Sequence, residues 1–394
     1  MVKSARVRRT QRDGATAPVL PEDLVLWEIF NRLPAKTLLR CRAVCRSWRR
    51  LTCDAEFLLA HHRRQPLLTL VLSSTPALGK APATLDALDL LQSPAVRRPI
   101  LGFSSCNECR KYYIHASCDG LLLLSRAYRL YYICNPATRQ WCALPNVSDV
   151  AALYHHRPSG EYRVLYRNRK HPYGPGSVAY YLLTVGSSLD GQRCIGLPVS
   201  SPSVKELMSE ALLDFSNPPV LLHGCLHWCY CRSWDTESKV LVFDTVDESF
   251  RCMQSPIAVK PALLRQMDGT LCIHHLDRGT MIVQVWVLQD YGMEVWSLKH
   301  KIQLPVLEMK QYVSDKEHLG WAGASDNGDT LLSGRYPQLL FHCDRKGKLV
   351  DKFQDDYEIR SVLQLSLKES LVRHAFFERK DRKRVKLPGF FRGL

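Results

Sequence analysis

Hydrophobic residues near the N-terminus follow the spacing of amphipathic helices. In the first predicted helix, which begins at Pro21, the apolar face recurs at i, i+3, i+4 and i+7 and comprises Leu26, Ile29, Phe30 and Leu33. Pro34 ends this helix and opens a second one, from Ala35 to about Cys41, and a third helix aligns Val44, Trp48 and Leu51. Residues 20–62 are therefore predicted to form three short helices, a unit that buries too little surface to be robust without a partner.

After Pro66 the pattern changes to the alternation of β-strands, and a hairpin recurs. Each copy has an apolar strand, a turn and a second strand; the copies are residues 131–145, 180–198, 240–256, 283–305 and, more weakly, 339–353. The prolines that close the first four copies are separated by 53, 58 and 49 residues. A turn followed by a strand recurs in step, at Asp119-Gly120, His223-Gly224, Asp268-Gly269 and Asn327-Gly328.

A period of about 50 residues with four short strands per unit is typical of propeller blades, of which kelch repeats are nearest in length. The fold class predicted is α+β with several domains: three small helices, then a mainly antiparallel β domain at residues 66–375, either a β-propeller or, as the alternative, a β-sandwich. Residues 1–18 lack any apolar period and are predicted to be a disordered basic tail. Residues 379–394 are interpreted as a second basic tail.

The net charge of +16 is concentrated at the two ends of the chain. Residues 1–64 carry +8 and residues 379–394 carry +6, which leaves +2 for the segment between them. A nearly neutral β domain disfavours nucleic acid as a partner. The 15 cysteines follow no disulfide framework, and the chain shows neither an export signal nor an apolar run long enough for a membrane span. We therefore expect reduced thiols, no membrane partner, and a location in the nucleus, the cytoplasm or both.

One stretch resembles a known family. Residues 20–49 carry a leading Leu-Pro, a second Leu-Pro after the first helix, and Val-Cys-Arg-Ser-Trp at residues 44–48, and they closely resemble the F-box in the form common in plants. Residues 53–57 resemble the segment that trails an F-box. Further on, residues 117–123 and 132–141 resemble the opening of the plant F-box-associated interaction domain. Together with the repeats, the resemblance accounts for most of the chain.

The resemblance implies that the helices dock an adaptor of the Skp family, which links them to a cullin and a ubiquitin-conjugating enzyme. The residues that match the family's adaptor-facing or core-forming positions are Leu20, Pro21, Leu24, Ile29, Leu33, Pro34, Leu38, Val44 and Trp48. A Trp with Leu and Ile anchors is also the composition of an interface centre. Trp27 departs from the family, which usually has a polar residue there. The apolar residues could instead only hold the bundle together, or the basic helices could read DNA.

The resemblance implies a substrate-recognition subunit of an SCF-type ubiquitin ligase, whose β domain captures a protein target without catalysing a reaction itself. The alternative is a propeller that binds a glycan or RNA, with a regulatory F-box. Candidate contacts for an acidic or phosphorylated target are Arg163, Arg167, Arg169 and Lys170. A nuclear-import signal or a solubilising tail would account for the basic run Arg379, Lys380, Arg382, Lys383, Arg384 and Lys386.

Two groups of cysteines and histidines contain residue types that ligate zinc. Zinc could be held by Cys106, Cys109, His115 and Cys118, or by an alternating run of cysteines and histidines at 223–231, but neither pattern has the second Cys-x-x-Cys pair that makes such a signal specific. No phosphate loop, nucleophile elbow or His-Glu-x-x-His is present. We therefore predict no metal, no cofactor and no catalytic residue.

Overall fold

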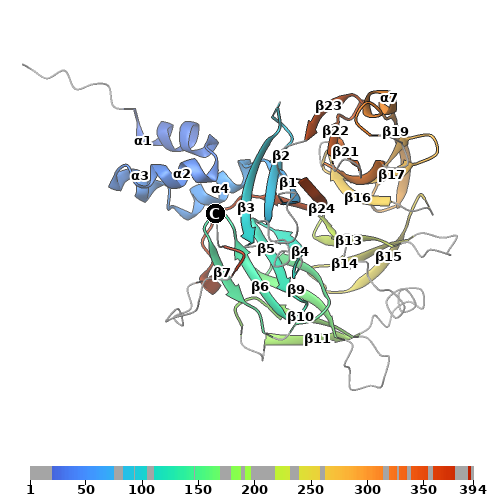
Figure 1. Cartoon of the computed structure of the whole chain (residues 1–394). Coiled ribbons are helices and arrows are strands. Elements are labelled where there is room, and N and C mark those ends of the chain that lie inside the picture. Colours follow the sequence, from blue (N-terminus) through green and yellow to red (C-terminus); the bar gives the residue numbers. More distant parts are fainter. Residues whose placement is uncertain are drawn as a thin grey trace, which may run out of the picture. The chain divides into compact units, whose positions relative to one another are not determined.

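The structure is a computed structural model of the 394-residue chain (Figure 1). It describes residues 20–74, 83–92, 94–103, 111–145, 147–168, 179–187, 191–196, 218–230, 239–257, 262–313, 319–325, 328–334, 339–353, 358–377 and 389–391. The chain divides into two compact units, Met1–Gln65 and Pro66–Leu394. In the described part of the chain, no helix has both the length and the apolar character that crossing a membrane requires.

The first unit is built from consecutive helical segments. Their bounds are α1 Glu22–Leu24, η1 Val25–Ile29, η2 Phe30–Arg32, α2 Ala35–Cys41, α3 Arg46–Leu51 and α4 Ala55–Arg64. The first predicted helix is thus a single helical run whose winding changes from α to π at η1 and to 3-10 at η2. Because a π turn holds more residues than an α turn, the predicted apolar face is not kept. Ile29 is exposed, whereas Leu26 and Phe30 are buried.

A fourth helix, α4, follows the three that were predicted. The Asp54 carboxylate caps it by accepting a hydrogen bond from the backbone N–H of Phe57 (2.9 Å). Its buried positions are Phe57, Leu58, His61 and His62. Since two of these four residues are histidines, the apolar period is weak, and the prediction of three helices was wrong for that reason.

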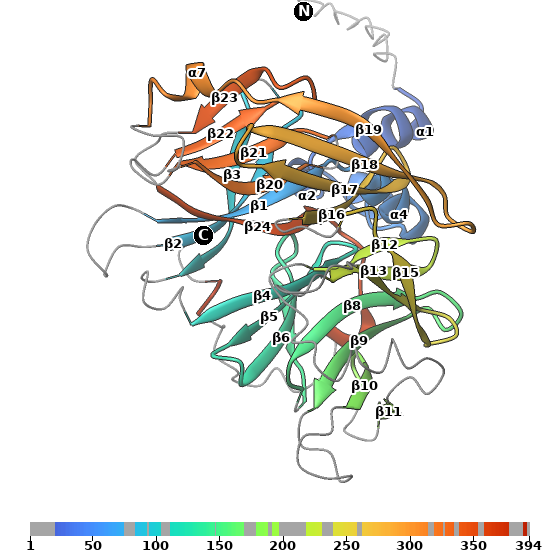
Figure 2. The ribbon, with the colours of Figure 1, turned by 90° about the vertical axis from the view of Figure 1, so that its right-hand side faces the viewer.

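The second unit consists of six antiparallel sheets of four strands, numbered here as blades 1 to 6 (Figure 2). Blade 1 comprises β24 Glu358–Lys368, β1 Leu67–Ser74, β2 Ala83–Asp89 and β3 Val96–Phe103. Blade 2 comprises β4 Tyr112–Cys118, β5 Leu121–Arg126, β6 Leu130–Asn135 and β7 Gln140–Ala143. Blade 3 comprises β8 Val150–His156, β9 Glu161–Asn168, β10 Ala179–Thr184 and β11 Gln192–Gly196.

Blades 4 to 6 have the same order of strands. Blade 4 comprises β12 Val220–Leu222, β13 Cys225–Tyr230, β14 Lys239–Asp244 and β15 Phe250–Gln254. Blade 5 comprises β16 Ala262–Met267, β17 Thr270–Asp277, β18 Ile282–Asp290 and β19 Val295–Gln303. Blade 6 comprises β20 Leu319–Ala324, β21 Thr330–Gly334, β22 Leu339–Cys343 and β23 Leu349–Phe353. Among the described residues of this unit, two short helices lie outside the sheets, α7 Val306–Met309 and η5 Ala375–Phe377. The predicted propeller is confirmed, with six blades, and the sandwich alternative is wrong.

The ring of blades is closed by the two ends of the β unit. Strand β24, from the end of the chain, pairs antiparallel with β1, as in the register Leu68↔Leu367, and the two lie side by side in both views (Figures 1 and 2). Strand β24 contacts the first strands of both neighbouring blades, β4 and β20. Blade 1 is therefore assembled from both ends of the unit. This pairing closes the ring, so no gap is left between the first and the last blade.

The hydrophobic core is divided into clusters that lie between neighbouring blades. The cluster between blades 1 and 2 contains Leu122 and Leu124 of β5, whereas Leu121 and Leu123 of the same strand belong to the cluster between blades 2 and 3. Equivalent clusters join blades 3 and 4, 4 and 5, 5 and 6, and 6 and 1. Because both faces of a blade are buried, its middle strands are continuous apolar runs, as in Leu121–Leu124.

The turns found in the sequence have the expected places in the blades. The paired turn residues Asp119-Gly120, His223-Gly224 and Asp268-Gly269 join the first two strands of blades 2, 4 and 5, and all six residues have positive φ. Such turns match the twist of a hairpin, and glycine adopts this conformation without a steric cost. The recurring hairpins of the sequence join the third and fourth strands of blades 2 to 6.

The C-terminal segment returns to the propeller after β24. Phe390 and Phe391 are buried in the cluster between blades 1 and 2, where the Phe390 ring meets the edges of Tyr112 and Tyr132 (centroids 5.8 and 5.7 Å). The Gly102 backbone N–H donates to the Phe390 carbonyl (3.0 Å). Residues 389–391 are therefore part of the folded unit, unlike the tail that was expected to run to residue 394.

Candidate functional site

A set of large apolar side chains is exposed on the helical unit. The set comprises Leu20, Leu24, Ile29 and Val44, whose side chains are between 44% and 65% exposed, and two neighbouring prolines, Pro21 and Pro34, are exposed as well. All six belong to the nine residues that the sequence assigned to the adaptor. Because docking surfaces commonly present exposed apolar side chains, the set is a candidate for the residues that contact a partner.

The other three assigned residues are less exposed. Leu38 is fully buried. Trp48 is half-buried, with its ring edge-to-face against Phe30 (centroids 4.9 Å apart). Leu33 is half-buried, and its carbonyl accepts hydrogen bonds from His61 Nε2 (2.8 Å) and Gln65 Nε2 (3.2 Å). Burial of the His61 ring lowers its pKa. The nine residues thus divide into an exposed set and a core set.

Trp27, where the family usually has a polar residue, has a structural contact. Its ring is half-buried and meets the ring of Phe57 edge-on, with centroids 5.9 Å apart. Trp27 therefore joins η1 to α4. Two of the arginines that could have read DNA have contacts within the helical unit: Arg42 Nη2 donates to the Thr52 carbonyl (2.6 Å), and Arg50 pairs with Glu22 (3.5 Å).

The connections of the propeller differ between its two faces. Because the strands of a blade alternate in direction, the turns between first and second strands and between third and fourth strands share one face, called here the short-turn face. The opposite face, called the long-connection face, carries the links between second and third strands and between blades, which span more residues of the sequence, as between β11 and β12 and between β19 and β20. Long loops on a rigid scaffold commonly carry binding, so this face is the candidate target surface.

The basic residues proposed to contact an acidic target are only partly described. Arg163, on β9, is paired with Glu248 in the β14–β15 turn and with Glu161 (3.5 Å). Arg167 is buried and paired with Asp149 (3.1 Å). Arg169 and Lys170 lie outside the described residues. Both described arginines are therefore engaged with carboxylates of the propeller itself.

Glu248 is a buried partner that sequence reasoning missed. Its carboxylate receives Arg163 and Arg193 of blade 3, and the Tyr154 hydroxyl donates to it (3.3 Å). The residue lies in the turn of blade 4, so the cluster joins two blades. The sequence contains no signal for this pairing, because Glu248 is far from the other three residues in the chain and each is ordinary in its own segment.

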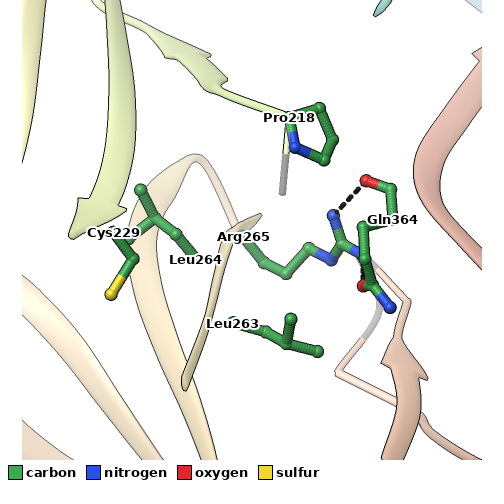
Figure 3. A pocket seen from close by; sticks show the side chains of 6 residues that line it. All are labelled: Pro218, Cys229, Leu263, Leu264, Arg265 and Gln364. Atoms are coloured by element: carbon green, nitrogen blue, oxygen red, sulfur yellow. Dashed lines mark hydrogen bonds between the residues drawn. The ribbon is translucent and has the colours of Figure 1, made fainter. Parts of the chain in front are cut away.

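A small cavity lies among the inner strands (Figure 3). Its volume is about 10 Å³, enough for one water molecule, and it is lined by Pro218, Cys229, Leu263, Leu264, Arg265 and Gln364. Arg265 donates to the Gln364 carbonyl (2.8 Å) and to its side-chain oxygen, and Gln364 Nε2 donates to the Ala322 carbonyl (2.5 Å). These bonds connect β16, β24 and β20, so the cavity is part of a structural link between three blades.

The metal-ligand candidates have other partners where they are described. His227 Nε2 is hydrogen-bonded to the Tyr291 hydroxyl (2.8 Å), and His227 Nδ1 lies 3.1 Å from the Val220 carbonyl. Burial lowers the pKa of this histidine to about 4. His115 is bonded to the Ser125 hydroxyl (2.7 Å). Cys106, Cys109 and Cys231 lie outside the described residues. Over the described ranges, no three His, Cys, Asp or Glu side chains converge as metal ligands.

A short helical unit followed by a closed six-bladed propeller is the architecture that two family models describe. The family model described as F-box-like matches residues 18–64, and the model described as F-box associated beta propeller domain matches residues 99–359. Since the second match alone covers more than half of the chain, this protein belongs to the plant-type F-box proteins with an F-box-associated propeller domain.

Curated relatives agree with the family over most of their length. The F-box protein At5g49610 of Arabidopsis thaliana is 27% identical over 317 residues, which span 74% of this chain and 81% of the relative. The F-box protein At3g07870 of the same plant is 25% identical over 383 residues, which span 86% of this chain and 88% of the relative. The likeness therefore extends well beyond the F-box into the propeller.

Proposed function

We propose that this protein is the substrate-recognition subunit of an SCF-type ubiquitin ligase. Its F-box would dock a Skp-family adaptor, which links it to a cullin, and its propeller would hold a protein target. One observation carries the proposal: the helical unit packs Phe30, Leu38 and Phe57 into a core and yet leaves an apolar set in water, comprising Leu20, Leu24, Ile29 and Val44. Membership of the F-box family supports the identity of the partner.

The exposed set is large enough to drive association. Complete burial of one Leu, Ile or Val side chain contributes about 1.5–3 kcal/mol, so four such side chains offset a substantial part of the entropy lost on binding. The helical unit is also small, and a partner that covers this surface would stabilise it. We expect the half-buried Trp48 and Leu33 to complete the interface from its edge.

The chain would contribute positioning to ubiquitin transfer, and the other subunits would supply the chemistry. A cysteine that forms a ubiquitin thioester needs a lowered pKa. Burial instead raises the pKa of the Cys134 thiol and raises that of Cys343 to about 12. These thiols are therefore unsuited to the role of a nucleophile.

Co-expression of the full chain with a Skp-family adaptor tests the proposal. We expect the wild type to retain the adaptor through purification, and Leu24→Asp and Val44→Asp each to weaken binding at least about tenfold, or about 1.4 kcal/mol, because each puts a charge into the apolar contact. These two residues are exposed, so their variants should fold. Leu33 and Trp48 are less suitable because they also support the bundle.

The matched control is Leu307→Asp, at an exposed leucine of α7 in the propeller unit. This variant carries the same change in charge and size and is expected to bind the adaptor as the wild type does. Far-UV circular dichroism and the melting temperature establish that each variant is folded. Wild-type protein that fails to retain the adaptor would exclude the receptor function and favour a propeller that binds a non-protein ligand.

A further inference from the structure

Two buried side chains of the helical unit converge on one backbone oxygen. His61 of α4 and Gln65, which follows α4 directly, place their Nε2 atoms 2.8 and 3.2 Å from the Leu33 carbonyl oxygen, and the two nitrogens lie 3.0 Å apart. Because a carbonyl oxygen can only accept hydrogen bonds, both nitrogens donate to it. The donors are 28 and 32 residues away from Leu33 in the chain, so this contact is made by the tertiary fold.

The carbonyl belongs to the corner between η2 and α2, called here the Leu33–Pro34 corner. Leu33 has extended backbone angles (φ −76°, ψ 145°), so the first helical run stops there, and Pro34 begins α2 as its N-cap. The Leu33 carbonyl and the Pro34 ring nitrogen share one rigid peptide plane. Hydrogen bonds that fix the carbonyl oxygen therefore also fix the plane from which the exposed Pro34 ring extends.

The helix that supplies these donors is itself fixed to the first helical run. The Trp27 ring of η1 meets the Phe57 ring of α4 edge-on (centroids 5.9 Å apart), and the Phe57 ring lies beside the ring of His61 (6.0 Å). The Asp54 carboxylate caps the start of α4. Helix α4 thus contacts the run at η1 and again at its end, so its position sets the direction of the Leu33–Pro34 corner.

The ring of His61 is not the most stabilising side chain for its position. Burial lowers the pKa of the ring, so it is neutral at pH 7.5, with its proton on Nε2 and a lone pair on Nδ1. His61 Nδ1 is buried and has no hydrogen-bond partner in the described part of the chain. Such an atom lowers stability, whereas a phenylalanine ring would fill the space without this cost. The histidine therefore supplies a donor at the expense of stability.

We propose that His61 and Gln65 are positioning residues for the adaptor, which hold the Leu33 carbonyl so that Pro34 and the exposed Ile29 are presented in one fixed arrangement. The inference deepens the proposed function and rests on it, because the adaptor is the partner that the corner would contact. Both donors are buried, so they act through the corner and do not touch the adaptor. A corner fixed in advance loses less conformational freedom on binding, which raises the affinity.

Titration of the full chain with a purified Skp-family adaptor, by calorimetry, tests the inference. His61→Phe keeps a ring but has no donor, and we expect it to weaken adaptor binding about three- to tenfold, which corresponds to one lost hydrogen bond. His61→Gln places an amide nitrogen near the position of Nε2 and should bind as the wild type does. The melting temperature of His61→Phe, followed by far-UV circular dichroism, should equal or exceed that of the wild type, because the unpaired Nδ1 is removed.

A double-mutant cycle separates positioning from stability. Ile29→Ala truncates an exposed contact of the helical run that ends at the corner. If His61→Phe has already displaced the corner, Ile29→Ala should cost less affinity in that background than in the wild type. Val44→Ala, between α2 and α3, should lower the affinity by the same factor in both backgrounds. An equal loss for Ile29→Ala in the two backgrounds would assign His61 to general stability and overturn the inference.

The matched control is His300→Phe, at an exposed histidine of β19 in the propeller unit, which should bind the adaptor as the wild type does. Unchanged affinity of His61→Phe, in a wild type that binds the adaptor, would overturn the positioning role and leave the receptor function in place. Equal weakening by His61→Gln and His61→Phe would likewise overturn the role of the donor. A wild type that does not bind the adaptor would overturn the receptor function and this inference together.

Discussion

Buried histidines show how a single residue can set the response of this propeller to pH. His274, on β17, is almost fully buried beside Leu263 and Val285 in the register, and burial, with smaller contributions from Arg265 and His300, lowers its pKa to about 3. Neither ring nitrogen has a hydrogen-bond partner among the described residues. His115 and His227, by contrast, each have a bonded partner.

We predict that His274→Leu raises the stability of the propeller and weakens its pH dependence. An unfolded histidine binds a proton below pH 6.5, whereas the buried ring does not do so until about pH 3, so the wild type loses stability as the pH falls. Between pH 7.5 and 5.5 this residue alone lowers the free energy of unfolding by about 1.4 kcal/mol. Removing a buried polar group that has no hydrogen bond adds roughly 1–3 kcal/mol to the free energy of unfolding at every pH.

Urea unfolding at pH 7.5, 6.5 and 5.5 measures both effects. The wild type should lose more free energy of unfolding than His274→Leu between the highest and lowest pH. Curves that shift equally for the two proteins would show that the ring is protonated in the folded state, against the environment described above.

At the scale of elements, the two kinds of hairpin turn use different local chemistry. The turns between first and second strands rely on positive φ and glycine, as at Asp268-Gly269. In every blade except blade 3, the turn between third and fourth strands begins with an Asp or Asn whose side chain accepts backbone N–H bonds, at Asp89, Asn135, Asp244, Asp290 and Asp344. Both signals are local, and for this reason the sequence shows the hairpins of blades 2 to 6 directly.

The C-terminal segment is an element that the sequence pattern did not indicate. Phe390 and Phe391 follow a long basic stretch, and two phenylalanines without a periodic context do not predict a core position. Their burial depends on the aromatic wall that Tyr112 and Tyr132 form in blade 2, which exists only in the folded propeller.

We predict that Phe390→Ala lowers the free energy of unfolding of the propeller by about 3–5 kcal/mol, because it empties a fully buried ring position between blades 1 and 2. Urea unfolding followed by tryptophan fluorescence measures the change. The control is Met293→Ala, at an exposed methionine of the β18–β19 turn, which should change stability by less than about 0.5 kcal/mol. Equal stability of Phe390→Ala and the wild type would mean that the C-terminal segment does not contribute to the fold.

At the scale of the whole molecule, most of the net positive charge lies at the two ends of the chain and little of it lies in the blades. The positive charge belongs to the helical unit and the C-terminal basic run, while the blades between them are nearly neutral. We propose that the basic run, whose residues lie outside the described part of the structure, acts as a nuclear-import signal. Because buried Phe390 and Phe391 follow it, deleting residues 379–394 would disturb the propeller as well as the signal.

The sharper experiment exchanges the basic residues and keeps the chain length. We expect replacement of the basic residues by glutamine to shift a fluorescent fusion of the full chain from the nucleus to the cytoplasm, while the melting temperature stays as in the wild type. The residues replaced are Arg379, Lys380, Arg382, Lys383, Arg384 and Lys386. An unchanged distribution would leave the run as a solubilising segment. The exchange separates import from folding, which a truncation cannot do.

Much of the candidate site could be predicted from sequence, but the role of each residue could not. The Leu-Pro pairs and the Trp48 motif identify the F-box, and the nine adaptor positions follow from them. The pattern does not say that Ile29 is exposed, because the change from α to π winding at η1 is not visible in the spacing of the apolar residues. Arg163 likewise looks like a free surface charge until blade 4 brings Glu248 to it.

The sequence by itself determined the features whose causes are local. Helical spacing, strand alternation and turn residues act over a few positions, so the F-box, the hairpins and the blade period are visible in it. Only the tertiary structure decided the number of blades, their closure by pairing of β1 with β24, and the burial of Phe390. These depend on contacts between residues distant in the chain, whose pairing follows from packing and leaves no periodic trace in the sequence.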